Sequence, residues 1–210
     1  MKSFHPLALA AAAACALSAC GGSGDDGDKA PVNAAPAGVF GIQTRSYDGA
    51  SDDLLTAGLG KAGLQGALPA YADPLHPTVA ELRRAAMYTS YRGLIDTTTA
   101  GGYGVLYGPN VTATGAVTTG DGKDAGTETP AVLADNPATL RAQVPASFDP
   151  KNPCIVTATS SGSRGVYGAI STGEWGLKRG CAVAYTDKGT GSAPHDLQND
   201  TVPLANGMRQ

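Results

Sequence analysis

Two serines in a short loop are the side chains best placed for chemistry. Residues 161–165 read SGSRG, which differs from the motif G-x-S-x-G only in its first glycine, so Ser163 could be an activated nucleophile. The backbone N–H groups of Ser161, Gly162 and Ser163 could instead stabilise the oxyanion that develops during acyl transfer. A third interpretation is structural, with one serine capping the first turn of a helix.

The segment after this loop favours the oxyanion interpretation. The oxyanion loop of an α/β-hydrolase precedes the strand and helix that carry the nucleophile. It is followed by a helix and then a strand that ends in an aspartate and two spaced glycines. Residues 184–191, AYTDKGTG, resemble that strand end. We therefore expect Ser161, Gly162 and Ser163 to form an oxyanion loop, with Ser163 as a nucleophile kept as the alternative.

Other kinds of chemistry find less support. His195 and Asp196 are adjacent, and adjacent residues cannot point at each other as members of a serine-hydrolase triad normally do. The glycine-rich turns lack the spacing of phosphate-binding loops, and the isolated histidines and cysteines lack metal-ligand spacing. The sequence thus predicts neither a cofactor nor a metal. A net charge of −3 without a basic cluster argues against nucleic-acid binding.

The loop lies inside a strand–helix–strand unit. Residues 154–158 (CIVTA) and 181–185 (CAVAY) are short apolar runs typical of buried strands. Between them, residues 166–179 predict an amphipathic helix that ends in a basic turn followed by glycine. Two strands joined through a helix are parallel neighbours. The expected fold class is therefore α/β, with ligand chemistry at the carboxyl ends of these strands.

The rest of the chain carries weaker patterns. Thr78 and Glu81 form a capping box at the start of a helix over residues 77–87. The other expected elements are an edge strand at 39–48, a strand within 103–111 that runs into a turn at 108–110, an exposed loop at 113–131 and a short turn of helix at 137–144.

The N-terminus predicts export. Residues 1–19 form a signal peptide whose apolar run is too short to span a bilayer. The sequence LSAC before and including Cys20 matches the site at which bacterial lipoproteins are cut and acylated. An ordinary secretory signal is the alternative, but the disordered linker over residues 20–38 suits an anchored protein. We expect a periplasmic or extracellular protein, attached to a membrane through a lipidated Cys20, with its globular part in residues 39–210.

Three cysteines remain after the signal is removed. If Cys20 is acylated, Cys154 and Cys181 form an even pair in an oxidising compartment. Each begins one of the two predicted parallel strands, so a disulfide between them is expected. Two buried free thiols are the alternative, because a disulfide across parallel strands is geometrically awkward.

Long segments of the chain resemble a known family. Residues 90–111 (SYRGLIDTTTAGGYGVLYGPNV), 152–191 and 195–202 closely resemble the bacterial D-(-)-3-hydroxybutyrate oligomer hydrolases. The resemblance extends over nearly all of the mature chain. It implies an exported serine esterase that cleaves dimers and short oligomers of 3-hydroxybutyrate into monomers during the degradation of poly(3-hydroxybutyrate). Its partner would be this small-molecule substrate.

The resemblance also implies that the chain is incomplete. Members of the family continue far past position 210, so their nucleophilic serine and its partners would lie outside this chain. The expected fold is then the N-terminal portion of an α/β-hydrolase-type parallel sheet, and the 210-residue chain alone should be inactive. The alternative function is that of a standalone exported lipoprotein with a binding or structural role and no catalysis.

Overall fold

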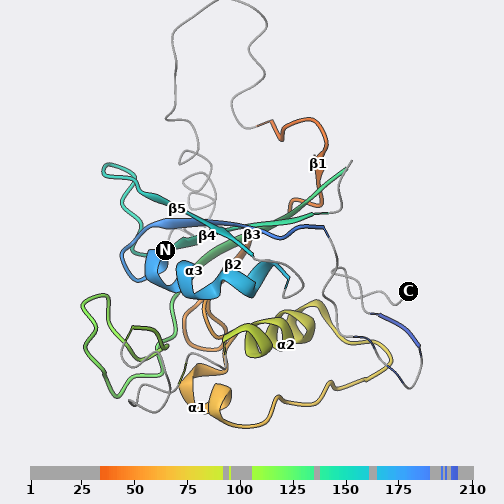
Figure 1. The fold of residues 1–210 in the computed structure, drawn as a ribbon, viewed down its shortest axis with the longest axis horizontal. Helices are drawn as coiled ribbons and strands as arrows, with labels where there is room; N and C mark the ends of the chain where they lie inside the picture. Colours follow the sequence, from red (N-terminus) through yellow and green to blue (C-terminus); the bar gives the residue numbers. More distant parts are fainter. Residues whose placement is uncertain are drawn as a thin grey trace, which may run out of the picture.

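The computed structural model describes residues 34–91, 95, 106–134, 138–160, 165–189, 195, 197 and 200–202. In these residues one sheet lies over a group of helices (Figure 1). In chain order the elements are β1 (Val39–Phe40), β2 (Arg45–Tyr47), α1 (Gly60–Gln65), α2 (Val79–Tyr91), β3 (Gly126–Leu133), β4 (Thr139–Pro145), β5 (Ile155–Thr159), the 3-10 helix η4 (Val166–Ala169), α3 (Ile170–Leu177) and β6 (Ala182–Thr186).

The sheet is mixed, with the strand order β1–β3–β4–β6–β5 and with β2 also paired to β3. Strands β5 and β6 are parallel, in a register that runs from Ile155 opposite Ala182 to Thr159 opposite Thr186. The other pairs are antiparallel. The predicted parallel pair is therefore confirmed, with η4 and α3 as the connection between its strands.

Two sequence-based predictions are wrong. The segment expected as an exposed loop ends in β3, and the expected turn of helix at 137–144 is β4; the two strands pair over seven residues. Both were missed because their inward positions hold polar residues, Glu128, Arg141 and Gln143, in place of the apolar residues that usually mark a buried strand face. In the segment predicted as a strand running into a turn, the described part (106–111) has the predicted turn, at residues 109 and 110. Before it lie bends in place of a strand, and after it a single bridge joins Val111 to Val117.

Helix α2 forms where its capping box predicted, although it extends four residues beyond 87. The Thr78 N–H donates to Glu81 Oε2 at 2.7 Å, and the Glu81 N–H donates to Thr78 Oγ1 at 3.3 Å. Its buried face includes Met87 and Tyr91, which belong to the main hydrophobic core.

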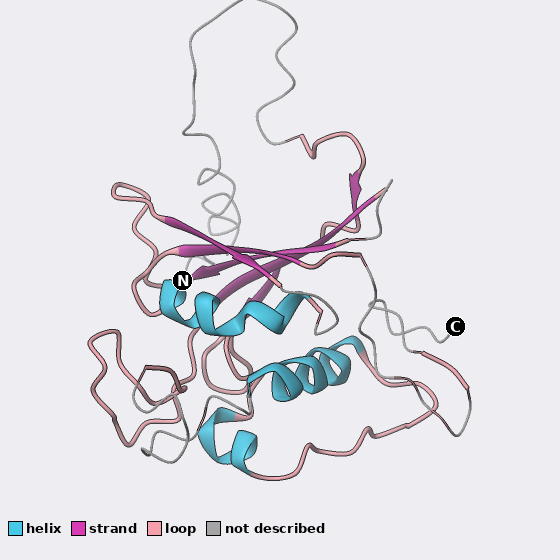
Figure 2. Ribbon diagram, viewed as in Figure 1, coloured by secondary structure: helices cyan, strands magenta, loops and turns pink. Residues whose placement is uncertain are grey.

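The described helices all lie on one side of the sheet (Figure 2). Two glycines of α3 allow this helix to approach the strands closely. A Cβ atom at Gly173 would overlap the hydroxyl of Tyr185, and one at Gly176 would lie 2.9 Å from Val183 Cγ2. Because Tyr185 and Val183 belong to β6, the face of the sheet that carries them is the face that packs on α3.

Candidate functional site

The carboxyl ends of β5 and β6 form the edge of the sheet where the chemistry was predicted. The Ser160 N–H donates to the Thr186 carbonyl at 2.8 Å, so the two chain segments stay paired one residue beyond β5. The predicted oxyanion residues Ser161, Gly162 and Ser163 follow directly and lie outside the described residues. The structure describes the two segments that flank them, which end at Ser160 and begin again at Gly165.

Ser160 was not singled out from the sequence. Its side chain is 1% exposed, and its Oγ has no hydrogen-bond partner in the part of the chain that the structure describes. Buried hydroxyls are normally paired, so an unpaired one calls for an explanation. The only sequence signal was its position at the end of an apolar strand, which is where ligand sites in parallel sheets occur.

Asp187, at the end of β6, has a structural role. Its Oδ1 accepts hydrogen bonds from the N–H groups of Thr139 (2.8 Å) and Gly189 (2.9 Å). Its own N–H donates to the Thr139 carbonyl at 3.1 Å. The aspartate and glycine that resembled the end of a hydrolase strand therefore fix the turn after β6 to the start of β4.

On the other side of the predicted loop, the chain enters η4 through Gly165. This residue has φ 71° and ψ −174°, a backbone conformation that would be strained for any residue with a side chain. Two residues later, the buried Tyr167 donates its hydroxyl hydrogen to Glu128 Oε2 at 2.8 Å and accepts from Arg141 Nη1 at 2.8 Å. The start of the helix is thereby tied to the sheet through side chains.

Glu128 is the centre of a buried charge cluster, which we define as Arg83, Glu128, Arg141, Gln143 and Tyr167. Its carboxylate accepts hydrogen bonds from Arg83 Nε (2.9 Å), Arg141 Nη1 (2.6 Å) and Gln143 Nε2 (2.7 Å), besides the Tyr167 hydroxyl. Burial alone raises the pKa of Glu128, but the charges of Arg141 and Arg83 outweigh it and bring the pKa down to about 2. Glu128 is therefore ionised at neutral pH.

Further contacts close this charge cluster. Arg83 Nη1 forms an ion pair with Asp52 Oδ1 at 2.8 Å. The two arginines of the cluster are therefore matched by two carboxylates, those of Glu128 and Asp52. The Tyr185 hydroxyl donates to Gln143 Oε1 at 2.8 Å. Burial raises the pKa of Tyr167 and of Tyr185, which remain protonated as donors. The cluster connects α2, β3, β4 and η4, and through Tyr185 it also reaches β6. It thereby fixes the start of the helical connection, next to the predicted loop.

A second buried acid holds the connecting helix farther along. Glu174 of α3 accepts hydrogen bonds from the Tyr91 hydroxyl, from the Gly108 N–H at 2.9 Å and from Lys178 Nζ at 2.6 Å. The connection between β5 and β6 is therefore anchored by buried charge both near its start and near its end.

A pocket of about 250 Å³ lies beside the last turn of α3, at the opposite end of that helix from the predicted loop. It is lined by Pro109, Asn110, Val111, Thr112, Ala113, Thr118, Asp124 and Lys178. Burial raises the pKa of Asp124, while the Lys178 ammonium opposes the shift. This pocket therefore lies away from the carboxyl ends of β5 and β6 and is not part of the predicted site.

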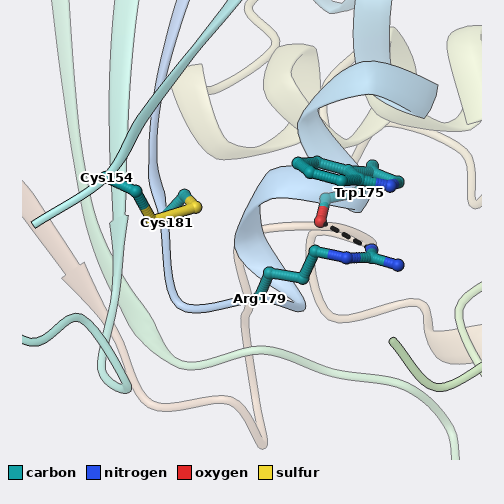
Figure 3. The surroundings of a disulfide bond; sticks show 4 residues. All are labelled: Cys154, Trp175, Arg179 and Cys181. Atoms are coloured by element: carbon teal, nitrogen blue, oxygen red, sulfur yellow. Dashed lines mark hydrogen bonds between the residues drawn. A yellow bond between two sulfur atoms is a disulfide. The ribbon is translucent and has the colours of Figure 1, made fainter. Parts of the chain in front are cut away.

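The structure contains a disulfide between Cys154 and Cys181, with an S–S distance of 2.10 Å and 27 residues of sequence separation (Figure 3). The two cysteines directly precede β5 and β6, at the end of the strands away from the predicted loop. Nearby, the guanidinium of Arg179, two residues after the end of α3, lies 4.2 Å from the ring centroid of Trp175 and donates a hydrogen bond to the Trp175 carbonyl. The disulfide thus joins the amino ends of the two parallel strands.

The remaining predicted groups have no described place in a site. His195 Nε2 lies 2.8 Å from Asp200 Oδ1, whereas Asp196 and Cys20 lie outside the described residues. Among the residues with described positions, no three His, Cys, Asp or Glu side chains are grouped so that they could hold a metal ion. None of the described helices is long and apolar enough to cross a membrane.

These features define a mixed-sheet protein with a parallel strand–helix–strand unit and a loop at the strand ends where such sheets bind ligands. The family model "3HB-oligomer hydrolase (3HBOH)" matches residues 16–210. The chain therefore belongs to the 3HB-oligomer hydrolase family, as the resemblance implied.

Several curated proteins named D-(-)-3-hydroxybutyrate oligomer hydrolase are similar to this chain. The protein from Polaromonas naphthalenivorans is 62% identical over 99% of this chain, and that from Polaromonas sp. (strain JS666) is 60% identical over 97%. The Cupriavidus necator protein is 60% identical over 87%. The chain spans only 30%, 29% and 26% of the lengths of these relatives. No solved structure matches it.

Proposed function

We propose that this chain is the N-terminal part of an exported serine esterase that hydrolyses dimers and oligomers of 3-hydroxybutyrate to monomers. The observation that carries the proposal is the family match over residues 16–210, together with relatives whose names state that they hydrolyse 3-hydroxybutyrate oligomers. Because the chain spans about 30% of the length of those relatives, the activity belongs to a longer protein.

The sheet is proposed to be the opening part of an α/β-hydrolase sheet. The parallel pair β5 and β6 and the helical connection between them support this. In such an enzyme, a serine from the rest of the protein attacks the ester carbonyl, and a histidine takes the proton from the serine hydroxyl. The alcohol leaves as the histidine returns that proton, and water then releases the acid from the acyl-enzyme.

The loop of Ser161, Gly162 and Ser163 is proposed to serve the oxyanion of this reaction. The negative charge that develops on the carbonyl oxygen would be stabilised by backbone N–H groups, each typically worth about 3–4 kcal/mol in the transition state. Its flanks support the role, since Ser160 is hydrogen-bonded to β6 and Tyr167 is held by Glu128 and Arg141.

Export is proposed from the N-terminal signal and from the disulfide. Structural disulfides persist in oxidising compartments such as the periplasm and the extracellular space. The Cys154–Cys181 bond is therefore consistent with a protein that folds after export. Acylation of Cys20 would additionally attach the protein to a membrane.

The proposal places the nucleophile outside this chain, so it predicts that the mature chain, residues 20–210, releases monomer from 3-hydroxybutyrate dimers no faster than buffer does. The assay measures monomer release by the chain, by its Ser163→Ala variant and by a full-length relative as the positive control. Turnover by the chain that disappears in Ser163→Ala would identify Ser163 as the nucleophile. That result would overturn the assignment of this loop to the oxyanion.

A further inference from the structure

The two faces of the sheet have opposite chemistry. Glu128, Arg141 and Tyr185 lie on the face toward the helices, where they are buried or partly buried among charged and aromatic groups. Since side chains alternate along a strand, the residue before and the residue after each of these three lie on the opposite face of the sheet. We call that opposite side the outer face. One row of it, in register across β3, β4, β6 and β5, consists of Thr129, Ala142, Ala184 and Thr157.

The outer face is most exposed over β4, β6 and β5. Ala142, Ala184 and Thr157 are exposed, and Ile155 of the neighbouring row is 67% exposed, whereas Thr129 of β3 is half-buried and Ala131 of β3 is buried. The described helices lie on the other side of the sheet (Figures 1 and 2). The outer positions of this part of the sheet carry no charged side chain: Thr127, Thr129, Ala142, Val144, Ile155, Thr157, Ala182 and Ala184.

This composition does not suit contact with water. A sheet with one solvated face normally places apolar residues inward and polar or charged residues outward. Here the charged residues of β3 and β4 point inward, and the outward positions hold alanine, threonine, valine and isoleucine. Sheets with parallel strands are usually covered by helices on both faces, and small residues such as Ala142 and Ala184 allow a helix to pack closely.

We propose that the outer face is a docking surface for amphipathic helices from the part of the polypeptide that the relatives carry beyond the matched region. The chain spans 30% of the length of the Polaromonas naphthalenivorans relative, so most of that protein is available to cover a face that the described residues leave open. Strand β5 is also the last strand at its side of the described sheet order, and could receive a further strand there. The inference does not depend on the proposed activity.

The experiment compares this chain with a chimera that joins it to the remainder of the Polaromonas naphthalenivorans relative. Ala184→Cys places a thiol on the outer face, and Lys151→Cys places one on the exposed turn before β5 as the matched control. Both are treated with a maleimide under native conditions, and labelling of each cysteine is measured by peptide mass spectrometry. Denatured samples give the rate for full access.

In the 210-residue chain, both cysteines are expected to react at comparable rates. In the chimera, Cys at position 184 is expected to react at least about tenfold more slowly, because labelling would require local opening, while position 151 stays accessible. Equal labelling of position 184 in the two proteins would overturn the proposal. Protection of position 184 already in the 210-residue chain would also overturn it. Such protection would indicate a second copy if it weakened on dilution, or residues 1–33 if it disappeared when they were removed.

A second variant guards against a poorly behaved chimera. Ala184→Glu should leave the thermal midpoint of the 210-residue chain unchanged, because a charge on an exposed face costs little there. In the chimera the same charge would be buried, and the yield of folded soluble protein should fall severely. If both proteins tolerate Ala184→Glu equally, the outer face is not a docking surface. If the 210-residue chain itself fails to fold with this change, the face is already covered and the proposal fails.

Discussion

Replacing Glu128 with glutamine is expected to lower the free energy of unfolding of the mature chain by about 3–5 kcal/mol, the usual cost of removing one partner from a buried ion pair. The amide has nearly the same shape as the carboxylate but leaves Arg83 and Arg141 without their shared negative partner. It also presents N–H groups to donors that need an acceptor. The measurement is urea-induced unfolding of the wild type and Glu128→Gln at neutral pH.

Glu81→Gln is the matched control. This acid is only partly buried and caps the start of α2, so its change should cost no more than about 1 kcal/mol. A Glu128→Gln variant as stable as Glu81→Gln would show that the charge cluster contributes little to the fold.

The free energy of unfolding of the wild type and that of Glu128→Gln should depend differently on pH. The pKa of Glu128 is lowered to about 2 from an ordinary value of 4.5, so the unfolded state binds the proton more tightly than the folded state does. The stability that its ionised form contributes is therefore complete above about pH 4.5 and is lost as the pH falls toward about 2. The stability gap between wild type and Glu128→Gln should narrow over that interval. A gap of constant size from neutral pH to about pH 2.5 would contradict this account.

Removal of the disulfide is expected to have the second large effect. For two cysteines 27 residues apart, the loss of the cross-link should lower the free energy of unfolding by about 3–4 kcal/mol, mainly by freeing the unfolded chain. The double variant Cys154→Ala, Cys181→Ala is compared with the wild type in the presence and absence of reductant, again by urea unfolding.

Reductant serves as the internal control for this pair. It should destabilise the wild type to the level of the double variant and leave the double variant unchanged. Two alkylatable thiols at positions 154 and 181 in non-reduced, exported protein would contradict the bond itself.

The sequence predicted the part of the fold where local pattern and burial agree. Strands β5 and β6 are apolar runs, and Gly165 and Gly180 stand at the two ends of the helical connection between them, so a parallel unit could be expected. Strands β3 and β4 could not be recognised in this way, because Glu128, Arg141 and Gln143 occupy inward positions. These polar side chains can be buried because they pair with one another in one cluster. That pairing depends on the tertiary structure and cannot be read from a local stretch of sequence.

The candidate site shows the same division. Its position at the ends of β5 and β6 follows from the order of strand, loop and helix, which the sequence displays. The contacts that hold the flanks of the loop do not follow from it, since Tyr167 reaches Glu128, 39 residues away in sequence. Ser160 is not recognisable from the sequence, because a serine after a strand is ordinary; only the burial of its hydroxyl without a hydrogen-bond partner among the described residues makes it notable.

Hydrolysis of 3-hydroxybutyrate dimers by the chimera, with and without Ser163→Ala, tests the central claim most directly. If this chain supplies the opening of the sheet and the oxyanion loop, the folded chimera should release monomer. Ser163→Ala should then reduce kcat by less than the ~10²–10³-fold that accompanies loss of an oxyanion donor, because the backbone N–H remains. A folded chimera without turnover, or one in which Ser163→Ala abolishes turnover as loss of a nucleophile does, would contradict the account.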